Sequence, residues 1–252
     1  MKIDAASCLQ ALGLIMAWSL PSQAVAEPDE TPPEIRATFE QFRAAVAELN
    51  DASVLFSRKE WLNGSYRPFQ QMEMSYRANG DIYIRFAGKD SRGREVMWRP
   101  SVDPGVLLVK PSPLLPKIKI DPDGALARKD SRHHIGLATF HALGDRILGE
   151  MDKLRDDPVL DGDFEDLGTR IAEGRNAHCF VVDLPRDEDP SLYSDRIELC
   201  FDLSTHLPVT LQAWEKDGEE YRLVEDYSWT QVELNPGFGD EVFDPKNPAY
   251  NF

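Results

Sequence analysis

The side chains that most often carry chemistry, histidine and cysteine, are few in this chain of 252 residues. Histidine can bind a metal ion or transfer protons near neutral pH. The chain has five histidines, at positions 133, 134, 141, 178 and 206. In an extended segment the adjacent His133 and His134 point to opposite faces and cannot bind one metal ion together. We therefore expect no metal site. We interpret Arg132-His133-His134 as the lead-in to a helix, bonded to backbone carbonyls or to an acidic loop.

The common catalytic and nucleotide-binding motifs are absent from the sequence. It contains no Gly-x-Ser-x-Gly elbow, no Walker loop, no Gly-x-Gly-x-x-Gly and no His-Glu-x-x-His. Its 44 acidic residues are so abundant that no pair of carboxylates stands out as an acid and a base. We therefore expect no catalytic residues, no cofactor and no enzymatic activity.

Residues 1–26 have the features of a secretory signal peptide. Lys2 gives a positive start, an apolar run follows over residues 11–20, and Ala24-Val25-Ala26 fits the rule for cleavage between Ala26 and Glu27. The apolar run of about ten residues is too short to cross a bilayer core of roughly 30 Å. We expect a periplasmic protein whose mature chain is a single domain over residues 27–252.

The chain is strongly acidic, with a formal net charge of −16 from 44 acidic and 28 basic residues. This charge repels nucleic-acid phosphates, and no basic patch with interleaved aromatic residues offsets it. It also argues against adhesion to anionic membranes. We expect no nucleic-acid partner and no stable membrane insertion. The charge is best interpreted as the solubilising surface of a monomer.

Two cysteines, Cys179 and Cys200, would remain after export to an oxidising compartment, which favours a disulfide between them. Both lie in segments that alternate apolar and polar residues, as half-buried strands do. If these strands pair antiparallel with the cysteines opposite each other, the same register pairs Phe180 with Leu199, Val182 with Ile197 and Asp183 with Arg196. We expect a structural disulfide, since the chain has no Cys-x-x-Cys.

Three more alternating runs between Met72 and Trp98 predict an antiparallel meander with one apolar face. Asn79-Gly80 is a strong hairpin signal between the first two runs, and Ser91-Arg92-Gly93 turns into the third. The apolar face carries Met72, Met74, Tyr76, Ile82, Ile84, Phe86, Val96 and Trp98. Further strands are predicted near residues 53–62, 105–110, 117–120, 168–173, 177–184, 194–203, 207–215 and 220–233. The prolines at 111, 113 and 116 indicate that the strand near 117–120 lies at an edge.

Two substantial helices accompany these strands. The first is predicted over residues 31–50, starting with a capping box at Thr31 and Glu34. The second follows residues 131–136, and residues 156–168 after it are predicted to be loop. The tail, residues 235–252, is too rich in Pro, Gly and Asn for regular structure, but its four aromatic residues predict that it packs. About ten strands linked by hairpins indicate an α+β fold with a strongly curved antiparallel sheet.

Several motifs in order resemble the domain-of-unknown-function family 1571 of exported bacterial proteins. They include residues 81–88, Gly93 to Trp98, Ile120 to Gly124, Ser131-Arg132-His133, Leu207-Pro208-Val209 and residues 243–252. One departure is His134, where the family pattern has proline. That family is similar to LolA, LolB and RseB. The resemblance implies a half-open barrel whose helices cover the concave face, and a cavity that in LolA and LolB receives lipoprotein acyl chains.

Our first functional hypothesis is therefore a carrier that holds lipid or lipoprotein acyl chains, because each buried methylene contributes about 0.8 kcal/mol. The candidate lining residues are Met72, Met74, Tyr76, Ile82, Ile84, Phe86, Val96 and Trp98. The alternative for each of them is a place in an ordinary core that the helices fill. The second hypothesis is an envelope sensor like RseB that binds a protein partner, and the third is an enzyme of unknown type.

Overall fold

The computed structural model describes residues 31–88, 91, 93–157 and 159–252. The predicted signal peptide, its cleavage position at Ala26 and Glu27, and Arg92 of the predicted turn lie outside the described residues. From Thr31 to Phe252 the chain forms one compact unit.

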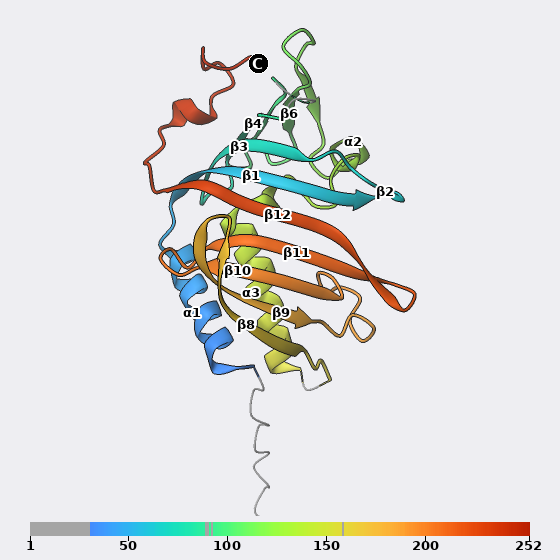
Figure 1. Cartoon of the computed structure of the whole chain (residues 1–252). Coiled ribbons are helices and arrows are strands. Elements are labelled where there is room, and N and C mark those ends of the chain that lie inside the picture. The colour runs from blue at the N-terminus through green and yellow to red at the C-terminus, as the bar shows by residue number, and fades with distance from the viewer. Residues whose placement is uncertain (1–30, 89–90, 92, 158) are drawn as a thin grey trace, which may run out of the picture. The chain divides into compact units, whose positions relative to one another are not determined.

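The described residues form one antiparallel sheet of twelve strands, in the order β7-β6-β5-β4-β3-β1-β12-β11-β10-β9-β8, with β2 paired to β1 (Figure 1). The strands are β1 Asp51–Leu62, β2 Ser65–Tyr66, β3 Gln70–Arg77, β4 Ile82–Phe86, β5 Glu95–Trp98, β6 Leu107–Lys110, β7 Ile118–Ile120, β8 Asp163–Ala172, β9 Arg175–Asp183, β10 Arg196–Asp202, β11 Pro208–Asp217 and β12 Glu220–Leu234. The sheet does not close, since β7 and β8 lie at its two edges. This confirms the predicted α+β half-barrel.

Two details of the sheet differ from the prediction. The sheet has twelve strands rather than about ten, and the two-residue β2 was missed because so short a strand carries no alternation. Strand β8 begins at Asp163, inside the segment predicted to be loop. Its acidic residues resemble a solvated loop, but most of its side chains are exposed, as is common in an edge strand.

The predicted meander forms with its apolar residues on one face. Opposite pairs are Met72 with Phe86, Met74 with Ile84 and Tyr76 with Ile82. Val96 lies opposite Ile84 on the next strand. Gly80 closes the first hairpin with a φ of 89°, a backbone conformation that other residues rarely adopt.

The cysteine hairpin has the register that the sequence predicts. Cys179 lies opposite Cys200, and a disulfide joins them. The same register pairs Phe180 with Leu199, Val182 with Ile197 and Asp183 with Arg196. The two sulfurs lie on the convex face of the sheet with Ala177 and Val209, and the large apolar side chains face the concave side.

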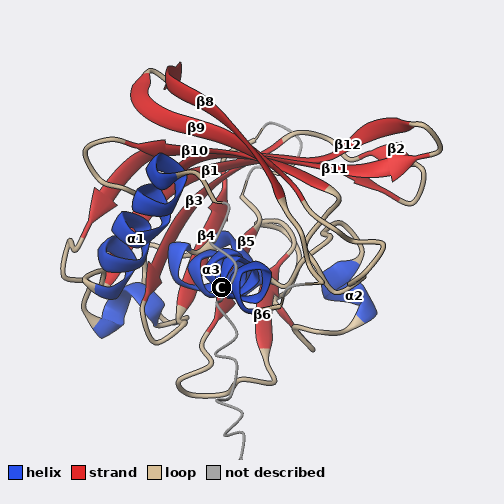
Figure 2. Ribbon diagram, turned by 90° about the horizontal axis from the view of Figure 1, so that it is seen from below, coloured by secondary structure: helices blue, strands red, loops and turns tan. Residues whose placement is uncertain are grey.

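The helices cover the concave face (Figure 2). They are α1 Pro33–Ala47, α2 Ala125–Arg128, a 3-10 turn η1 Ile135–Ala138 and α3 Phe140–Asp156. Helix α1 begins one residue later than predicted, because Pro32 is its N-cap, so the predicted capping box at Thr31 and Glu34 does not form. Helix α3 starts at the N-cap Thr139, whose hydroxyl accepts a hydrogen bond from the Ala142 amide at 3.3 Å. The apolar sides of both helices and of the sheet form the main core.

The tail packs on the convex face, on the opposite side of β4 and β5 from the helices. It contains one 3-10 turn, η2 Asp240–Phe243. Phe243 is buried with Tyr83 and Met97, and the Tyr250 ring stacks on Tyr83 with centroids 3.9 Å apart. The Asn251 side chain donates to the buried Glu95 carboxylate at 2.7 Å. Both faces of the meander are therefore covered by protein.

Candidate ligand-binding cavity

A cavity lies between the concave face of the sheet and the segment that links β7 to α3, residues 121–139. We call this segment the cover; it contains α2 and η1. The cavity has about 90 Å³ of space for the centres of water molecules. The space is limited, and most of the residues that line it are apolar.

Both the strands and the cover contribute apolar and polar residues to the wall. The strands contribute Phe56, Met72, Ile84, Phe86, Val96, Leu107, Val109 and Ile120. The cover and α3 contribute Pro122, Ala127, Ile135, Leu137, Ala138 and Leu143. The polar groups are those of Arg58, Glu60, Arg94, Ser131, His133, His134, Tyr193 and Tyr227. A mostly apolar wall with a limited number of polar groups is the usual lining of a small-molecule site.

Four of the eight predicted lining residues are in this wall: Met72, Ile84, Phe86 and Val96. The structure places the other four elsewhere in the core. Met74, Tyr76 and Ile82 are fully buried, and the Tyr76 hydroxyl accepts a hydrogen bond from the Phe140 amide at 3.4 Å. The Trp98 ring packs edge-on against His134 at 4.5 Å. Whether any of the eight contacts a ligand stays a prediction.

The cover is attached to the sheet through Arg132. Its Nε donates to Oε1 of Glu225 at 2.8 Å, and one Nη donates to Oε1 of Glu215 at 2.6 Å. The other Nη donates to the Trp61 carbonyl at 3.2 Å. Nε2 of His133 lies 2.6 Å from the same Glu225 oxygen. The predicted lead-in thus binds carboxylates of the sheet, and one backbone carbonyl, rather than an acidic loop.

Glu225 is 1% exposed, so its charge needs the partners that surround it. Burial by itself raises the pKa of this carboxyl. The hydrogen bond from His133, together with Tyr193 and the charge of Arg132, outweighs that effect and lowers its pKa. A second buried carboxylate, Glu60, accepts from the Tyr227 hydroxyl at 2.6 Å. Glu60 and Glu225 thus belong to a buried network of ion pairs and hydrogen bonds beside the cavity.

Most of this network was not predicted from the sequence. Its members on the strands are Arg58 and Glu60 of β1 and Glu225 of β12. A usable signal existed, because Arg58 and Glu60 continue the alternation of the buried Val54 and Phe56. A charged residue at a position where alternation predicts burial indicates a buried ion pair.

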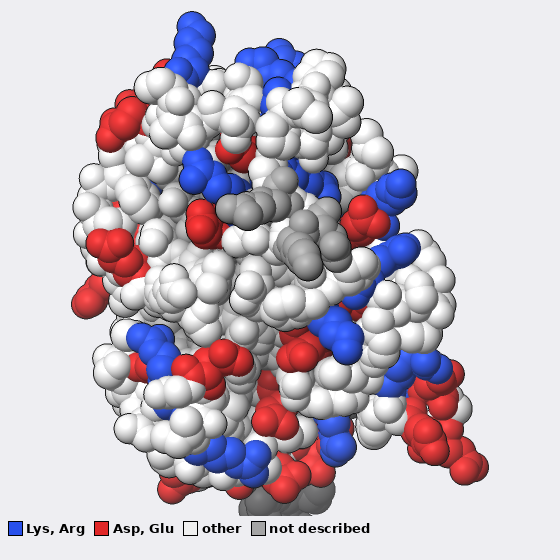
Figure 3. All heavy atoms as spheres, turned by 45° about the horizontal axis from the view of Figure 1, so that its top comes forward, with Lys and Arg blue, Asp and Glu red and all other residues white. Residues whose placement is uncertain are grey.

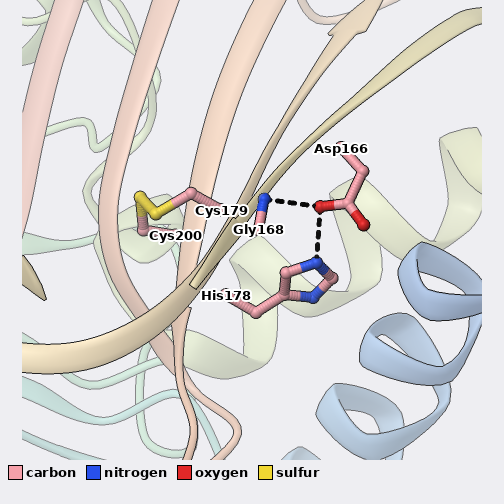
Figure 4. The surroundings of a disulfide bond; sticks show 5 residues. All are labelled: Asp166, Gly168, His178, Cys179 and Cys200. Carbon is pink, nitrogen blue, oxygen red and sulfur yellow. Dashed lines mark hydrogen bonds and ion pairs between the residues drawn. A yellow bond between two sulfur atoms is a disulfide. The ribbon is translucent and has the colours of Figure 1, made fainter. Parts of the chain in front are cut away.

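His178 joins two groups in an arrangement that resembles a catalytic triad. Its Nδ1 lies 2.6 Å from the Thr38 hydroxyl of α1, and its Nε2 lies 2.9 Å from Oδ1 of Asp166 on β8 (Figure 4). Burial raises the pKa of Asp166, but the Gly168 amide and His178 outweigh it and lower that pKa. Thr38 is buried, and its hydroxyl also donates to the Glu34 carbonyl at 3.0 Å. The set thus fastens α1 to the β8–β9 hairpin and presents no accessible nucleophile.

Within residues 31–88, 91, 93–157 and 159–252, no three His, Cys, Asp or Glu side chains gather as metal ligands would. In the same part of the chain, no helix has the length and apolarity to span a bilayer. On the face drawn in Figure 3, acidic and basic side chains are interspersed among uncharged surface.

Comparison with known proteins gives a family and a set of similar folds. The family described as "Protein of unknown function (DUF1571)" matches residues 49–252. No curated protein matches the chain. Among solved structures, LprF from Mycobacterium bovis is 10% identical, with 82% of this chain and 96% of that chain covered and a TM-score of 0.48.

Two further solved structures are similar at comparable levels. The lipoprotein LppX of Mycobacterium tuberculosis is 12% identical, with 83% of this chain and 99% of that chain covered and a TM-score of 0.47. A LolA superfamily protein from Nitrosomonas europaea is 10% identical, with 83% and 96% covered and a TM-score of 0.34.

Proposed function

Since this chain belongs to the DUF1571 family, whose description assigns no function, we propose from its cavity that it is a non-enzymatic binding protein. The ligand is the apolar chain of a lipid or of an acylated lipoprotein, held between the concave face and the cover. The observation that carries the proposal is the apolar part of the cavity wall, which includes Met72, Ile84, Phe86 and Val96.

The cavity size fits one part of such a ligand. Each methylene removed from water contributes about 0.8 kcal/mol, so even a short buried segment adds several kcal/mol. The space present accommodates a short chain or the end of a longer one. A longer chain displaces α2, which has no buried residue of its own, while Arg132 holds the following part of the cover in place. Methionine at position 72 suits a variable ligand because its side chain adapts to irregular shapes.

Export to the periplasm belongs to the same proposal. The periplasm is an aqueous compartment, and an acyl chain crosses it when a protein keeps the chain out of water. A monomeric carrier is the simplest form of such a protein. A sensor that binds a protein partner is the second candidate. It is distinguished by recovery of a stoichiometric protein partner, without lipid, from envelope extracts.

The proposal is tested by a substitution in the cover that places a large side chain in the cavity. Ala127 of α2 lines the cavity, whereas Ala125, two residues earlier, is exposed and does not. We expect Ala127→Trp to abolish uptake of a fluorescent fatty acid and the matched control Ala125→Trp to leave it unchanged. Native mass spectrometry of gently purified protein should show bound lipid in the wild type and the control only. Equal uptake by both variants, or none by the delipidated wild type, would contradict the proposal.

A further inference from the structure

Arg94 is the residue on the cavity wall whose charge is not matched. It precedes β5 and shares the face of Val96, with which it lines the cavity. Its guanidinium lies over the Phe86 ring at 4.7 Å from the centroid. Within the described residues this guanidinium makes no hydrogen bond and no ion pair. An arginine side chain has five N–H donors, so several remain available to a ligand.

The other charged groups of the wall already have partners. Arg58 donates to Gln70 and to the Ser131 hydroxyl, both at 2.8 Å, and lies 3.4 Å from Glu60. His133 is bound to Glu225. Nδ1 of His134 accepts a hydrogen bond from the Gly136 amide at 3.0 Å. The pKa of His134 is lowered, mainly by burial. The wall therefore has one unpaired cation facing an apolar space.

The surroundings of Arg94 add to this imbalance. Burial, and then repulsion by the nearby charge of Arg58, lower the pKa of Arg94, and Asp130 offsets them only in part. An arginine keeps its charge at neutral pH in spite of such a shift. A half-buried cation is costly without an opposite charge. An anion placed against Arg94 would offset this cost and gain charge-assisted hydrogen bonds.

We propose that the cavity selects an anionic amphiphile, with the head group, a carboxylate or a phosphate, bound by Arg94 and the chain lying along Phe86, Val96 and Ile84. This inference rests on the proposed binding function and specifies its ligand class. A guanidinium forms paired hydrogen bonds with either head group, so both belong to the same recognition chemistry.

The test compares ligands that share a chain and differ in the head group. Affinities of the full mature chain are measured for dodecanoate, dodecyl phosphate and dodecanol, with inorganic phosphate as the head group alone. The variant is Arg94→Gln. The matched control is Arg99→Gln, which removes the same charge from the other end of β5, on the convex side of the sheet and outside this cavity. Circular dichroism melting curves establish that both variants are folded.

We expect the wild type and Arg99→Gln to bind dodecanoate and dodecyl phosphate about tenfold to hundredfold more tightly than dodecanol. Arg94→Gln should lose this preference and bind dodecanol unchanged. Equal affinity for all three chains in every protein would overturn the head-group proposal while leaving the binding function intact. No binding of any chain would overturn both. If inorganic phosphate binds as tightly as dodecyl phosphate, the site binds free anions, and the proposal of an amphiphilic ligand is overturned.

Discussion

Arg132 of the cover and Glu225 of β12 form an ion pair, 2.8 Å between Nε and Oε1, that links the cavity cover to the centre of the sheet. The carboxylate is almost fully buried and also binds His133 and Tyr193. The pair thus holds one end of the cover in place while α2, without buried residues, lies at the surface. The cover thus has one part bound to the sheet by an ion pair and another part, α2, without buried residues.

Removing the arginine should destabilise the fold, because it leaves the buried carboxylate short of a partner. We expect Arg132→Met to reduce the free energy of unfolding by about 3 kcal/mol, measured by urea denaturation. The matched control is Arg155→Met on α3, where an exposed arginine pairs with Asp156 and the loss should be much smaller, because water screens an ion pair at the surface. Similar losses in the two variants would show that the buried network contributes little.

Glu150 of α3 should make stability depend on pH. Burial raises its pKa from 4.5 to about 7, in spite of Arg146, whose Nη lies 2.7 Å away. Because the folded-state pKa exceeds the unfolded one, this group's contribution is fully present below pH 4.5 and is lost as the pH rises through about 7. The free energy of unfolding of Glu150→Gln, relative to that of the wild type, should therefore rise by up to about 3 kcal/mol from acidic to mildly alkaline pH.

The measurement is the unfolding free energy of both proteins across that pH range. The exposed Glu219, in the turn between β11 and β12, provides the matched Glu→Gln control for removing a carboxylate from the surface. A difference between Glu150→Gln and the wild type that does not change with pH would mean that the Glu150 carboxyl is ionised in the folded protein at no cost.

The disulfide should resist reduction in the folded protein, because Cys179 and Cys200 are both buried on the convex face. The bridge spans 21 residues, and its loss in Cys179→Ala/Cys200→Ala should lower the unfolding free energy by about 3 kcal/mol on the chain-entropy account. Thiol titration of the mature chain, denatured without a reductant, should detect no free thiol. Two reactive thiols in that assay would disprove the bridge.

The tail should contribute to stability through Phe243, which is 1% exposed beneath Arg77 and against Tyr83 and Met97. We expect Phe243→Ala to cost about 3–5 kcal/mol, seen as a lower melting temperature. Phe69→Ala is the control, since that ring is 60% exposed and should be nearly neutral. Truncation after Glu241 should cost at least as much as Phe243→Ala, and an unchanged melting temperature would show that the tail is not held.

Sequence patterns predicted the sheet well and the cavity only in part. Alternation fixes the face of each strand residue, which is why the meander and the cysteine register agree with the structure. The same alternation cannot tell which apolar residues lie under a helix. Met74 and Tyr76 are therefore core, while Met72 lines the cavity. The Arg132–Glu225 pair joins residues 93 positions apart, and no local pattern in the sequence indicates a contact at that distance.

The central position of β1 and β12 has a consequence for the order in which the molecule is built. Strands β1 and β3–β7 pair along one half of the sheet and β8–β12 along the other, and β1 with β12 is the seam between them. Phe56 meets Trp229 across that seam, a contact of long sequence separation that is slow to form. The pairing of β1 with β12 can form only when β12, the last strand in the chain, is available. Because Tyr227 of β12 belongs to the cavity wall, that wall is complete only after β12 has joined the sheet.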